Sequence, residues 1–347
     1  MTKIYQWTVV GAGPAGIAAI GKLLDLGISG TDLLWVDPQF KVGDLGSLWK
    51  NVSSNTKVRR FVDFLNAAES FNFQNADRDF RLNHLDPEET CCLSDVDDAL
   101  NWVSKQLMQK VNSEKALIQQ ISLSQRRWCL QTDSQCYYSY NVILATGAVP
   151  RFLDYSSAEL IPFEIAIDKE RLSSEIDNSQ TYALFGSSHS AIIILRHLID
   201  LDVKKVINFY RSPCRYAIEL NQWILFDNTG LKGQTAEWAR ENIDGQLPDN
   251  LVRYKSSQAN ITQYLPECNK IIYAVGFEKR NNIAIDGYEN SHYNPHVGII
   301  APGLFGLGIA YPQLKSDPFG NFELQVGLWK FMTYLNEVMP TWLKYHS

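Results

Sequence analysis

Gly11-Ala12-Gly13-Pro14-Ala15-Gly16 is the stretch that decides the fold predicted for this chain. It follows an apolar run and precedes an expected helix at residues 17–26, so it has the spacing of a turn between a buried strand and a helix. The first glycine permits a tight turn, the second lets the backbone approach a pyrophosphate, and the third lets helix and strand pack closely. Free N–H groups at the amino end of the helix then face the phosphates. The motif therefore predicts a dinucleotide site.

An acidic residue stands where such a site needs one. A second strand is expected at residues 32–37, and Asp37 at its end lies about 20 residues after Gly16, placed to accept hydrogen bonds from a ribose. Strand, turn, helix and strand form one βαβ unit. A glycine turn of purely structural use is the alternative, and the position of Asp37 argues against it.

A second unit of the same kind is expected at residues 182–210, around the turn Gly186-Ser187-Ser188-His189-Ser190-Ala191. Ser188 stands in place of the middle glycine and Ala191 in place of the third. Because a serine can donate to phosphate and alanine is common at the third position, this turn predicts a second dinucleotide site. The alternative is an inherited fold that no longer holds nucleotide. His189 is expected to be an exposed turn residue.

Arg211 follows the last strand of the second unit, where the 2′-phosphate of NADP would lie. An acidic residue at this position would favour NAD, whereas a guanidinium favours NADP. A plain surface charge is the alternative interpretation. The second site is therefore predicted to take NADP(H).

The two units predict an α/β fold with two Rossmann-like, three-layer domains, the second inserted in the first. Residues 1–150 and 285–347 are expected to form the first domain, and residues 151–284 the second.

Further elements are expected outside the two units, including a helix at residues 99–111 and a buried strand at residues 271–276. The others are a β-meander at residues 118–140, a buried strand at residues 142–145 and an amphipathic helix at residues 319–338.

Composition limits the partners and the compartment. The chain has 347 residues, of which 45% are apolar, and a net charge of -6, which suits two globular domains and disfavours nucleic acid as a partner. Without a basic leader or a membrane-length apolar segment, a cytoplasmic protein with no membrane span is expected. The six cysteines form no C-x-x-C pair, and no metal site is expected. The sequence leaves both a monomer and an oligomer open.

With its two turns, the chain resembles the two-dinucleotide flavoprotein superfamily, in which FAD occupies the first unit and NADPH the second. Ala145-Thr146-Gly147 is similar to that superfamily's A-T-G crossover segment, and Ala274-Val275-Gly276 to its counterpart on the way back. The stretch 302–308, which ends in Gly308, resembles the final FAD segment, although Ile309 stands where many members have an Asp.

One further segment narrows the resemblance. Gly46-Ser47-Leu48-Trp49, followed by Ser54-Asn55-Thr56-Lys57, is similar to the G-G-x-W and S-N-T segments of flavin-containing monooxygenases and their N-hydroxylating relatives. Disulfide reductases of the same superfamily instead carry a redox cysteine pair, which this chain lacks. The resemblance implies FAD contacts at Gly46, Ser47, Trp49, Ala145, Thr146, Gly147 and Gly308, and NADP contacts at Gly186, Ser187, Ser188, Ser190 and Arg211.

The resemblance also implies NADPH-dependent oxygenation of a small nitrogen or sulfur nucleophile. NADPH would reduce the flavin, O2 would add at its C4a carbon, and the resulting hydroperoxide would pass oxygen to the substrate. Asn55 would hydrogen-bond near the peroxide, and Trp49 would cover the cofactor and exclude water. A core role for Trp49 and a loop cap for Asn55 are the alternatives.

Two other functions stay open on the sequence. One is a flavin-dependent reductase that passes electrons from NAD(P)H to a quinone, a ferredoxin or a small redox protein without a redox-active disulfide. The other is a non-enzymatic FAD-binding protein with a degenerate NADP turn. The fate of the reduced flavin distinguishes the first of these from the monooxygenase.

Overall fold

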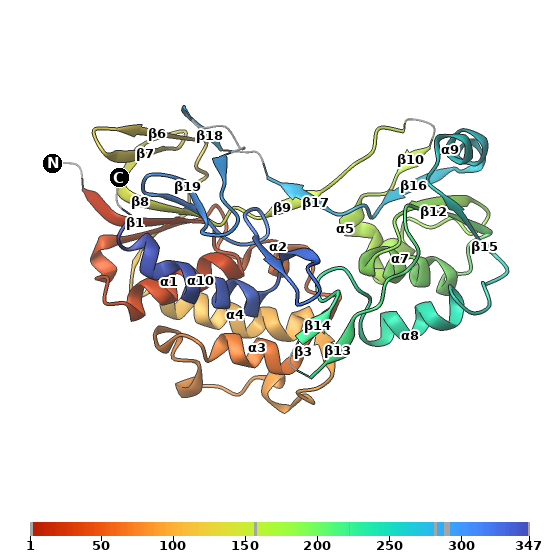
Figure 1. Cartoon of the computed structure of the whole chain (residues 1–347), viewed down its shortest axis with the longest axis horizontal. Helices are drawn as coiled ribbons and strands as arrows, with labels where there is room; N and C mark the ends of the chain where they lie inside the picture. Colours follow the sequence, from red (N-terminus) through yellow and green to blue (C-terminus); the bar gives the residue numbers. More distant parts are fainter. Residues whose placement is uncertain (1–2, 156–157, 222, 281–282, 288–291, 346–347) are drawn as a thin grey trace. The chain divides into compact units, whose positions relative to one another are not determined.

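The computed structural model describes residues 3–155, 158–221, 223–280, 283–287 and 292–345. The chain divides into two compact units, one formed by residues 1–148 with 279–347 and the other by residues 149–278 (Figure 1). Each unit holds a parallel sheet and helices. The predicted α/β fold class is therefore confirmed. The chain returns to the first unit at Lys279, earlier than the expected residue 285.

The first unit is built on a parallel sheet in the order β20-β8-β1-β2-β5. Its strands are β1 (Ile4–Val10), β2 (Leu33–Val36), β5 (Asn112–Glu114), β8 (Cys136–Leu144) and β20 (Leu304–Gly306). β2 is buried along its whole length and β1 over its last four residues. Continuous apolar burial of this kind is typical of parallel strands covered on both faces.

A β-meander extends this sheet through the amino half of β8. Its strands are β6 (Gln120–Ser124) and β7 (Arg127–Gln131), which pair antiparallel with each other and with β8. The strand expected separately at residues 142–145 is the carboxyl half of β8. One continuous strand forms because β1 pairs with β8 from Tyr138 to Leu144. Two short strands complete the sheet, β18 (Ala284–Ile285) beside β6 and β19 (Ile299–Ala301) beside β20.

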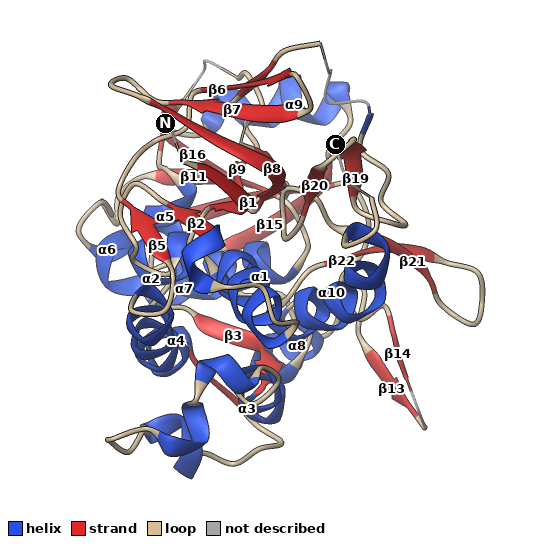
Figure 2. Ribbon diagram, turned by 90° about the vertical axis from the view of Figure 1, so that its left-hand side faces the viewer, coloured by secondary structure: helices blue, strands red, loops and turns tan. Residues whose placement is uncertain are grey.

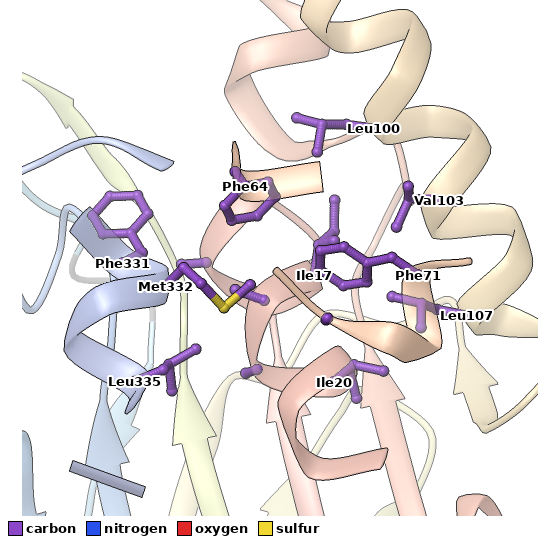
Figure 3. Packing of buried hydrophobic residues seen from close by; sticks show 14 of the residues in the cluster. Ile17, Ile20, Phe64, Phe71, Leu100, Val103, Leu107, Phe331, Met332 and Leu335 are labelled. Atoms are coloured by element: carbon purple, nitrogen blue, oxygen red, sulfur yellow. The ribbon is translucent and has the colours of Figure 1, made fainter. Parts of the chain in front are cut away.

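Helices cover the sheet of the first unit and enclose its largest apolar cluster (Figures 2 and 3). They are α1 (Pro14–Asp25), α3 (Val58–Leu65), α4 (Leu93–Met108) and α10 (Leu328–Trp342), with the short 3-10 helix η2 (Glu69–Phe71). Figure 3 shows Ile17 and Ile20 of α1 among side chains from α4, η2 and α10. The absence of a side chain at Gly21 makes room for the Phe71 ring, which a Cβ at that position would overlap.

The helix expected at residues 319–338 begins only at Leu328. The preceding residues form an antiparallel hairpin of β21 (Gln313–Ser316) and β22 (Phe322–Gln325). Its turn is closed by Asp317, whose carboxylate accepts the N–H groups of Phe319 and Asn321 at 2.9 Å, and by Gly320 at φ +83. An Asp side chain that accepts a hydrogen bond from the backbone N–H two residues later favours a turn over a helix. This turn therefore forms in place of the start of the helix that the sequence pattern predicts.

The shorter elements of the first unit connect these layers. They are η1 (Gly30–Asp32), α2 (Gly43–Ser47), β3 (Ser53–Lys57), η3 (Phe73–Asn75), η4 (Arg81–His84) and β4 (Thr90–Cys92). β9 (Ala148–Pro150) and β17 (Phe277–Lys279) pair with each other where the chain passes between the units.

The second unit has a five-stranded parallel sheet in the order β10-β16-β11-β12-β15. Its strands are β10 (Glu159–Leu160), β11 (Thr181–Phe185), β12 (Lys205–Tyr210), β15 (Leu251–Lys255) and β16 (Lys270–Tyr273). Its helices are α5 (Phe163–Ala166), α6 (Lys169–Ser173), α7 (His189–Asp200), α8 (Gly233–Asn242), α9 (Gln258–Tyr264) and η5 (Leu265–Glu267). A separate hairpin pairs β13 (Ile218–Leu220) with β14 (Trp223–Leu225).

Replacing Phe71 by Ala tests the packing of the first unit. Phe71 is fully buried, so Phe71→Ala should lower the free energy of unfolding by about 3–5 kcal/mol through lost contacts and a cavity. Phe319→Ala is the control, because Phe319 is 71% exposed, and it should change that free energy by less than about 0.5 kcal/mol. Urea unfolding monitored by fluorescence measures both. Equal effects of the two substitutions would contradict this description of the core.

Candidate functional site

The carboxyl ends of four neighbouring strands of the first sheet are aligned. Val10 is paired with both Val36 and Leu144, and Leu144 is paired with Gly306. The residues that follow these strand ends are Gly11, Asp37, Ala145 and Leu307. Open parallel sheets bind ligands at this edge. Three of the four residues are ones that the sequence predicts to bind a cofactor.

Gly11 and Gly16 are glycines because backbone occupies the space that a side chain would need. Gly11 has φ +112 and donates its N–H to the Val36 carbonyl oxygen at 2.8 Å. A Cβ at Gly11 would overlap the Ala145 carbonyl oxygen, and one at Gly16 would overlap the Gly11 carbonyl oxygen. The same Gly11 oxygen accepts the indole N–H of Trp35 at 2.9 Å, which ties the turn to β2. Both glycines are therefore required by the fold itself.

Gly13 differs from these two glycines. It has φ -75, which any residue can adopt, and a Cβ there would lie 3.9 Å from its nearest neighbours, Gly43 Cα and the Val42 carbonyl oxygen. It also precedes Pro14, the first residue of α1, and no side chain caps the helix at this end. Protein packing does not explain the missing side chain at Gly13. An open, uncapped helix amino terminus fits a phosphate that approaches the backbone closely.

The Asp37 carboxylate closes the turn from the other side. Its Oδ2 accepts the Ala12 N–H at 2.8 Å, and its Oδ1 accepts the N–H groups of Gln39 and Phe40 at 2.8 and 2.7 Å. A carboxylate offers about four acceptor positions, so about one is left for a ribose hydroxyl. Asp37 therefore holds the loops at the strand ends together, in addition to its predicted contact with a ribose.

The first crossover segment, Ala145-Thr146-Gly147, starts from the same edge. The Ala145 N–H continues the ladder by donating to the Val10 carbonyl oxygen at 2.8 Å. The Thr146 hydroxyl is buried and has no hydrogen-bond partner among the described residues. Gly147 has φ +75 and accepts the N–H of Arg280 at 3.3 Å. An orphaned buried hydroxyl is costly, and it fits a ligand group that bonds to it when bound.

Helix α2 brings the Gly46-Ser47-Leu48-Trp49 segment to the glycine turn. Gly43, with φ +61, lies so close to the turn that a Cβ on it would lie 3.0 Å from Gly13 Cα. A Cβ at Gly46 would overlap Asp97 Oδ1 of α4 and the Lys41 carbonyl oxygen. Gly46 thus permits close packing of α2 on α4. Ser47 is exposed, and its hydroxyl donates to the Gly43 carbonyl oxygen at 2.5 Å.

Trp49 and Asn55 follow α2 but differ in their surroundings. Trp49 is half-buried, and its N–H donates to the Asp44 carbonyl oxygen at 3.1 Å, so its backbone is fixed to α2. Asn55 lies on an exposed position of β3, and its Oδ1 accepts the Thr56 hydroxyl at 3.2 Å. Among the described residues, Asn55 makes no side-chain hydrogen bond to the glycine turn.

The last predicted residue of the first site, Gly308, packs on the start of α1. It has φ +89, and a Cβ there would lie 2.7 Å from the Ala15 Cβ. Ala15 is buried, so the final segment of the chain closes over the glycine turn. Ile309 packs against the large apolar cluster.

The strand ends of the second sheet are aligned in the same way. Phe185 is paired with both Phe209 and Tyr273, and Gly186 follows it with φ +132. A Cβ at Gly186 would overlap the Ala274 carbonyl oxygen, as one at Gly11 would overlap that of Ala145. In both turns, the first glycine therefore lies where a neighbouring carbonyl oxygen leaves no room for a side chain.

The polar residues of the second turn remain accessible. Ser188 is the exposed cap residue of α7, and its side chain makes no capping hydrogen bond. Ser190, in the first turn of α7, is partly exposed, and Arg211 is exposed directly after β12. The Ser187 hydroxyl donates to the Ser212 carbonyl oxygen at 2.7 Å, which holds the segment bearing Arg211 beside the turn.

His189 is not the exposed residue that the sequence predicts. Both of its ring nitrogens are buried and have no hydrogen-bond partner among the described residues. Burial, together with the nearby charge of Lys232, lowers the pKa of His189 to about 4. Because both ring nitrogens are shielded from water, the neutral form is the one that the fold accommodates.

The structure brings together two residues that no sequence motif indicated. Asp44 of α2 and Arg280, just after β17, form an ion pair with 2.8 Å between Oδ2 and Nη2. They are 236 positions apart in the chain. Because no motif links them, only the fold could bring them together.

Membrane-spanning helices and metal sites can be assessed for the residues that the structure describes. None of their helices has both the length and the hydropathy needed to cross a membrane. Among those residues, no group of three His, Cys, Asp or Glu side chains is arranged to hold a metal ion. An open hollow of about 590 Å³ lies between Asn66 and Asn83, and no predicted site residue lines it.

Two parallel sheets, each with a glycine turn at its carboxyl edge, define a protein with two dinucleotide-type sites, as in the two-dinucleotide flavoproteins. No family model matches the chain. Monooxygenase AgnR1 of Paecilomyces divaricatus is 31% identical over 96% of this chain and 97% of its own length. The chain therefore belongs to the monooxygenase family of which AgnR1 is a member.

Solved structures of the same fold include both monooxygenases and reductases. An ornithine N-hydroxylase from Kutzneria sp. 744 matches with a TM-score of 0.66 at 12% identity, with 99% of each chain covered. A bacillithiol disulfide reductase from Staphylococcus aureus matches with a TM-score of 0.63 at 11% identity, again with 99% of each chain covered. These likenesses confirm the predicted fold, whereas the oxidoreductase class rests on the relative at 31% identity.

The buried His189 makes stability depend on pH. Its pKa is about 4 in the folded protein and about 6.5 in an unfolded chain, so the unfolded state binds more protons between these values. Stability contributed by the neutral ring is complete above pH 6.5 and is lost as pH falls towards 4. Lowering the pH from 7 to 5 should cost about 2 kcal/mol through this residue.

The variant His189→Phe should remove that dependence while keeping the fold, because neither ring nitrogen has a hydrogen-bond partner to lose among the described residues. Urea unfolding at pH 7 and pH 5 measures the change. The exposed His296 is the control, and His296→Gln should retain the wild-type pH dependence. An unchanged pH dependence in His189→Phe would show that this ring is not the group responsible.

Proposed function

We propose that this monooxygenase binds FAD at the first site and NADPH at the second, and that it oxygenates a small nitrogen or sulfur nucleophile. The observation that carries the proposal is the relative named a monooxygenase, which is aligned with nearly the whole chain at 31% identity. The solved ornithine N-hydroxylase of the same fold, described with reduced FAD and NADP+, supports the choice of cofactors and of a nitrogen substrate.

The first site fits FAD. The backbone N–H groups of Gly13, Ala15 and Gly16 would face the pyrophosphate. The remaining acceptor position of the Asp37 carboxylate would bind the ribose. The buried Thr146 hydroxyl, which lacks a protein partner among the described residues, and the adjacent Gly147 would contact the cofactor, as would the segment ending at Gly308.

The flavin end would lie along α2. Gly46, Ser47 and Trp49 are fixed there by α4, by the Gly43 carbonyl oxygen and by Asp44. Trp49 would exclude water from the cofactor. When bound, the flavin accepts hydride from NADPH and activates O2. Asn55 would donate a hydrogen bond beside the reacting oxygen, since its exposed amide is available on β3.

The second site fits NADPH through charge and free donors. The hydroxyls of Ser188 and Ser190 are accessible at the amino end of α7, where phosphate is stabilised. Arg211 would pair with the 2′-phosphate. In this proposal, residues 1–148 with 279–347 form the FAD-binding domain and residues 149–278 the NADPH-binding domain.

The positions of the cysteines disfavour a disulfide reductase. Cys129 of β7 and Cys136 of β8 are neighbours, but Cys136 begins β8 at the end opposite to the glycine turn. Leu144 lies eight positions further along the extended strand, which corresponds to about 26 Å. Cys91 is buried, and burial raises its pKa to about 11, so it is a poor nucleophile near neutral pH. A reductase with another acceptor is tested below.

Rapid mixing tests the reaction. Under anaerobic conditions NADPH should bleach the flavin absorbance, and mixing the reduced protein with O2 should then restore it only after a delay. Asn55→Ala should shorten that delay roughly tenfold or more, because a donor at the reacting oxygen is lost. The exposed Asn83 provides the control, and Asn83→Ala should leave the delay unchanged.

Other outcomes point elsewhere. Immediate return of the oxidised spectrum in the wild-type protein would sink the monooxygenase proposal and favour a reductase. If NADPH does not bleach the flavin, the second site does not deliver hydride. A wild-type delay in Asn55→Ala would remove Asn55 from the mechanism.

Substitutions of Gly13 and Gly16 should distinguish an effect on cofactor binding from an effect on folding. Gly13→Ala should keep the stability of the apoprotein within about 1 kcal/mol, since its Cβ meets only ordinary contacts, yet weaken FAD at least about tenfold. Gly16→Ala should instead destabilise the apoprotein by about 1–3 kcal/mol through overpacking on the Gly11 carbonyl. Fluorescence titration with FAD and urea unfolding measure the two effects. Wild-type FAD affinity in Gly13→Ala would contradict the proposed pyrophosphate contact.

A further inference from the structure

The ion pair between Asp44 and Arg280 lies where three segments of the first unit meet. Asp44 belongs to α2, and its Oδ2 lies 2.8 Å from Arg280 Nη2. The same oxygen would lie 3.8 Å from a Cβ at Gly147, so the carboxylate lies beside the first crossover segment. The Arg280 N–H donates to the Gly147 carbonyl oxygen at 3.3 Å. One arginine thus contacts both α2 and the A-T-G segment.

The backbone of Asp44 connects its ion pair with Arg280 to the rest of α2. Its carbonyl oxygen accepts the N–H groups of Leu48 and Trp49 at 2.8 and 3.1 Å, which end α2. Its neighbour Gly43 lies against Gly13 of the glycine turn. Fixing the Asp44 side chain therefore fixes both ends of α2, one at the turn and the other at Trp49.

The preceding residue, Lys279, contacts another part of the same site. Its Nζ lies 4.2 Å from the centre of the Tyr311 ring, and the Tyr311 N–H donates to the Gly308 carbonyl oxygen at 3.0 Å. The Tyr311 ring also fills the space that a Cβ at Gly306 would need. Adjacent residues of an extended segment point to opposite sides, which explains how Lys279 and Arg280 reach different segments.

Because both side chains are partly buried, each charge is stabilised by the other. The Asp44 side chain is 25% exposed and that of Arg280 is 33% exposed, whereas most ion pairs of this unit join more exposed side chains. A charge left without its partner in such a place is desolvated and uncompensated. An arginine also holds a carboxylate in a fixed geometry, which a flexible ammonium does less well.

We propose that Arg280 is a positioning residue, which holds α2 and Trp49 against the glycine turn by its ion pair with Asp44 at the point where the chain returns to the first unit. The inference rests on the proposed function only in taking FAD as the cofactor that this arrangement serves. It does not depend on what the reduced flavin does with O2.

A double-mutant cycle on FAD affinity tests the inference. The variants are Arg280→Met, Asp44→Asn and the two combined, and the dissociation constant of FAD is measured by fluorescence titration of each apoprotein. Each single substitution should weaken FAD about tenfold, and the combined variant should be no weaker than either single one, because the pair acts as a unit. Arg280→Lys, which retains the charge, should recover part of the loss.

Controls separate positioning from folding. Lys315→Met removes an exposed ion pair with Glu337 in the same unit and should leave FAD affinity unchanged. Urea unfolding of each apoprotein identifies a variant that has lost its fold, and Arg280→Lys then carries the test. The visible circular dichroism of bound FAD should change in Arg280→Met and return towards the wild-type signal in Arg280→Lys.

Two results would overturn the inference: wild-type FAD affinity in both single variants, or losses that simply add in the combined variant. These results differ from a failure of the proposed function, in which wild-type protein binds FAD but returns immediately to the oxidised spectrum with O2.

Discussion

The contact between Gly16 and the Gly11 carbonyl oxygen is the constraint on which the first site depends. No side chain fits at residue 16, so α1 can approach β1 as closely as the turn requires. This approach leaves the uncapped amino end of α1 at the carboxyl edge of the sheet, beside Asp37 and Ala145. The aligned ends of β1, β2, β8 and β20 then supply the remaining loops from distant parts of the chain.

The second unit reaches the same geometry with fewer glycines. Gly186 repeats the role of Gly11, since a Cβ on it would overlap the Ala274 carbonyl oxygen. Ala191 takes the position of Gly16. Its Cβ fits because Gly186 has no Cβ, and one built there would lie only 3.0 Å from the Ala191 Cβ. The departures from the glycine pattern therefore do not prevent the fold. A phosphate bound at this turn, as proposed, would be recognised by hydroxyls and the helix terminus.

Fold alone does not decide between an oxygenase and a reductase, because structures of both kinds match the chain almost equally well. Chemistry in such proteins depends on the few groups that surround the cofactor. In this chain, the segment proposed to contact the flavin is fixed by contacts that run through α2: Gly46 on α4, Ser47 on Gly43, and Asp44 on Arg280.

The sequence by itself determined both βαβ units, the insertion of one domain in the other, and the steric roles of Gly11 and Gly16, because short-range spacing dictates a strand, a turn and a helix. It failed where long-range contacts or local turn chemistry decided the outcome. The Asp317 turn replaced the start of the last helix, and burial made His189 a neutral interior residue. Only the tertiary structure joined Asp44 to Arg280, since no sequence period relates residues that meet through the return of the chain.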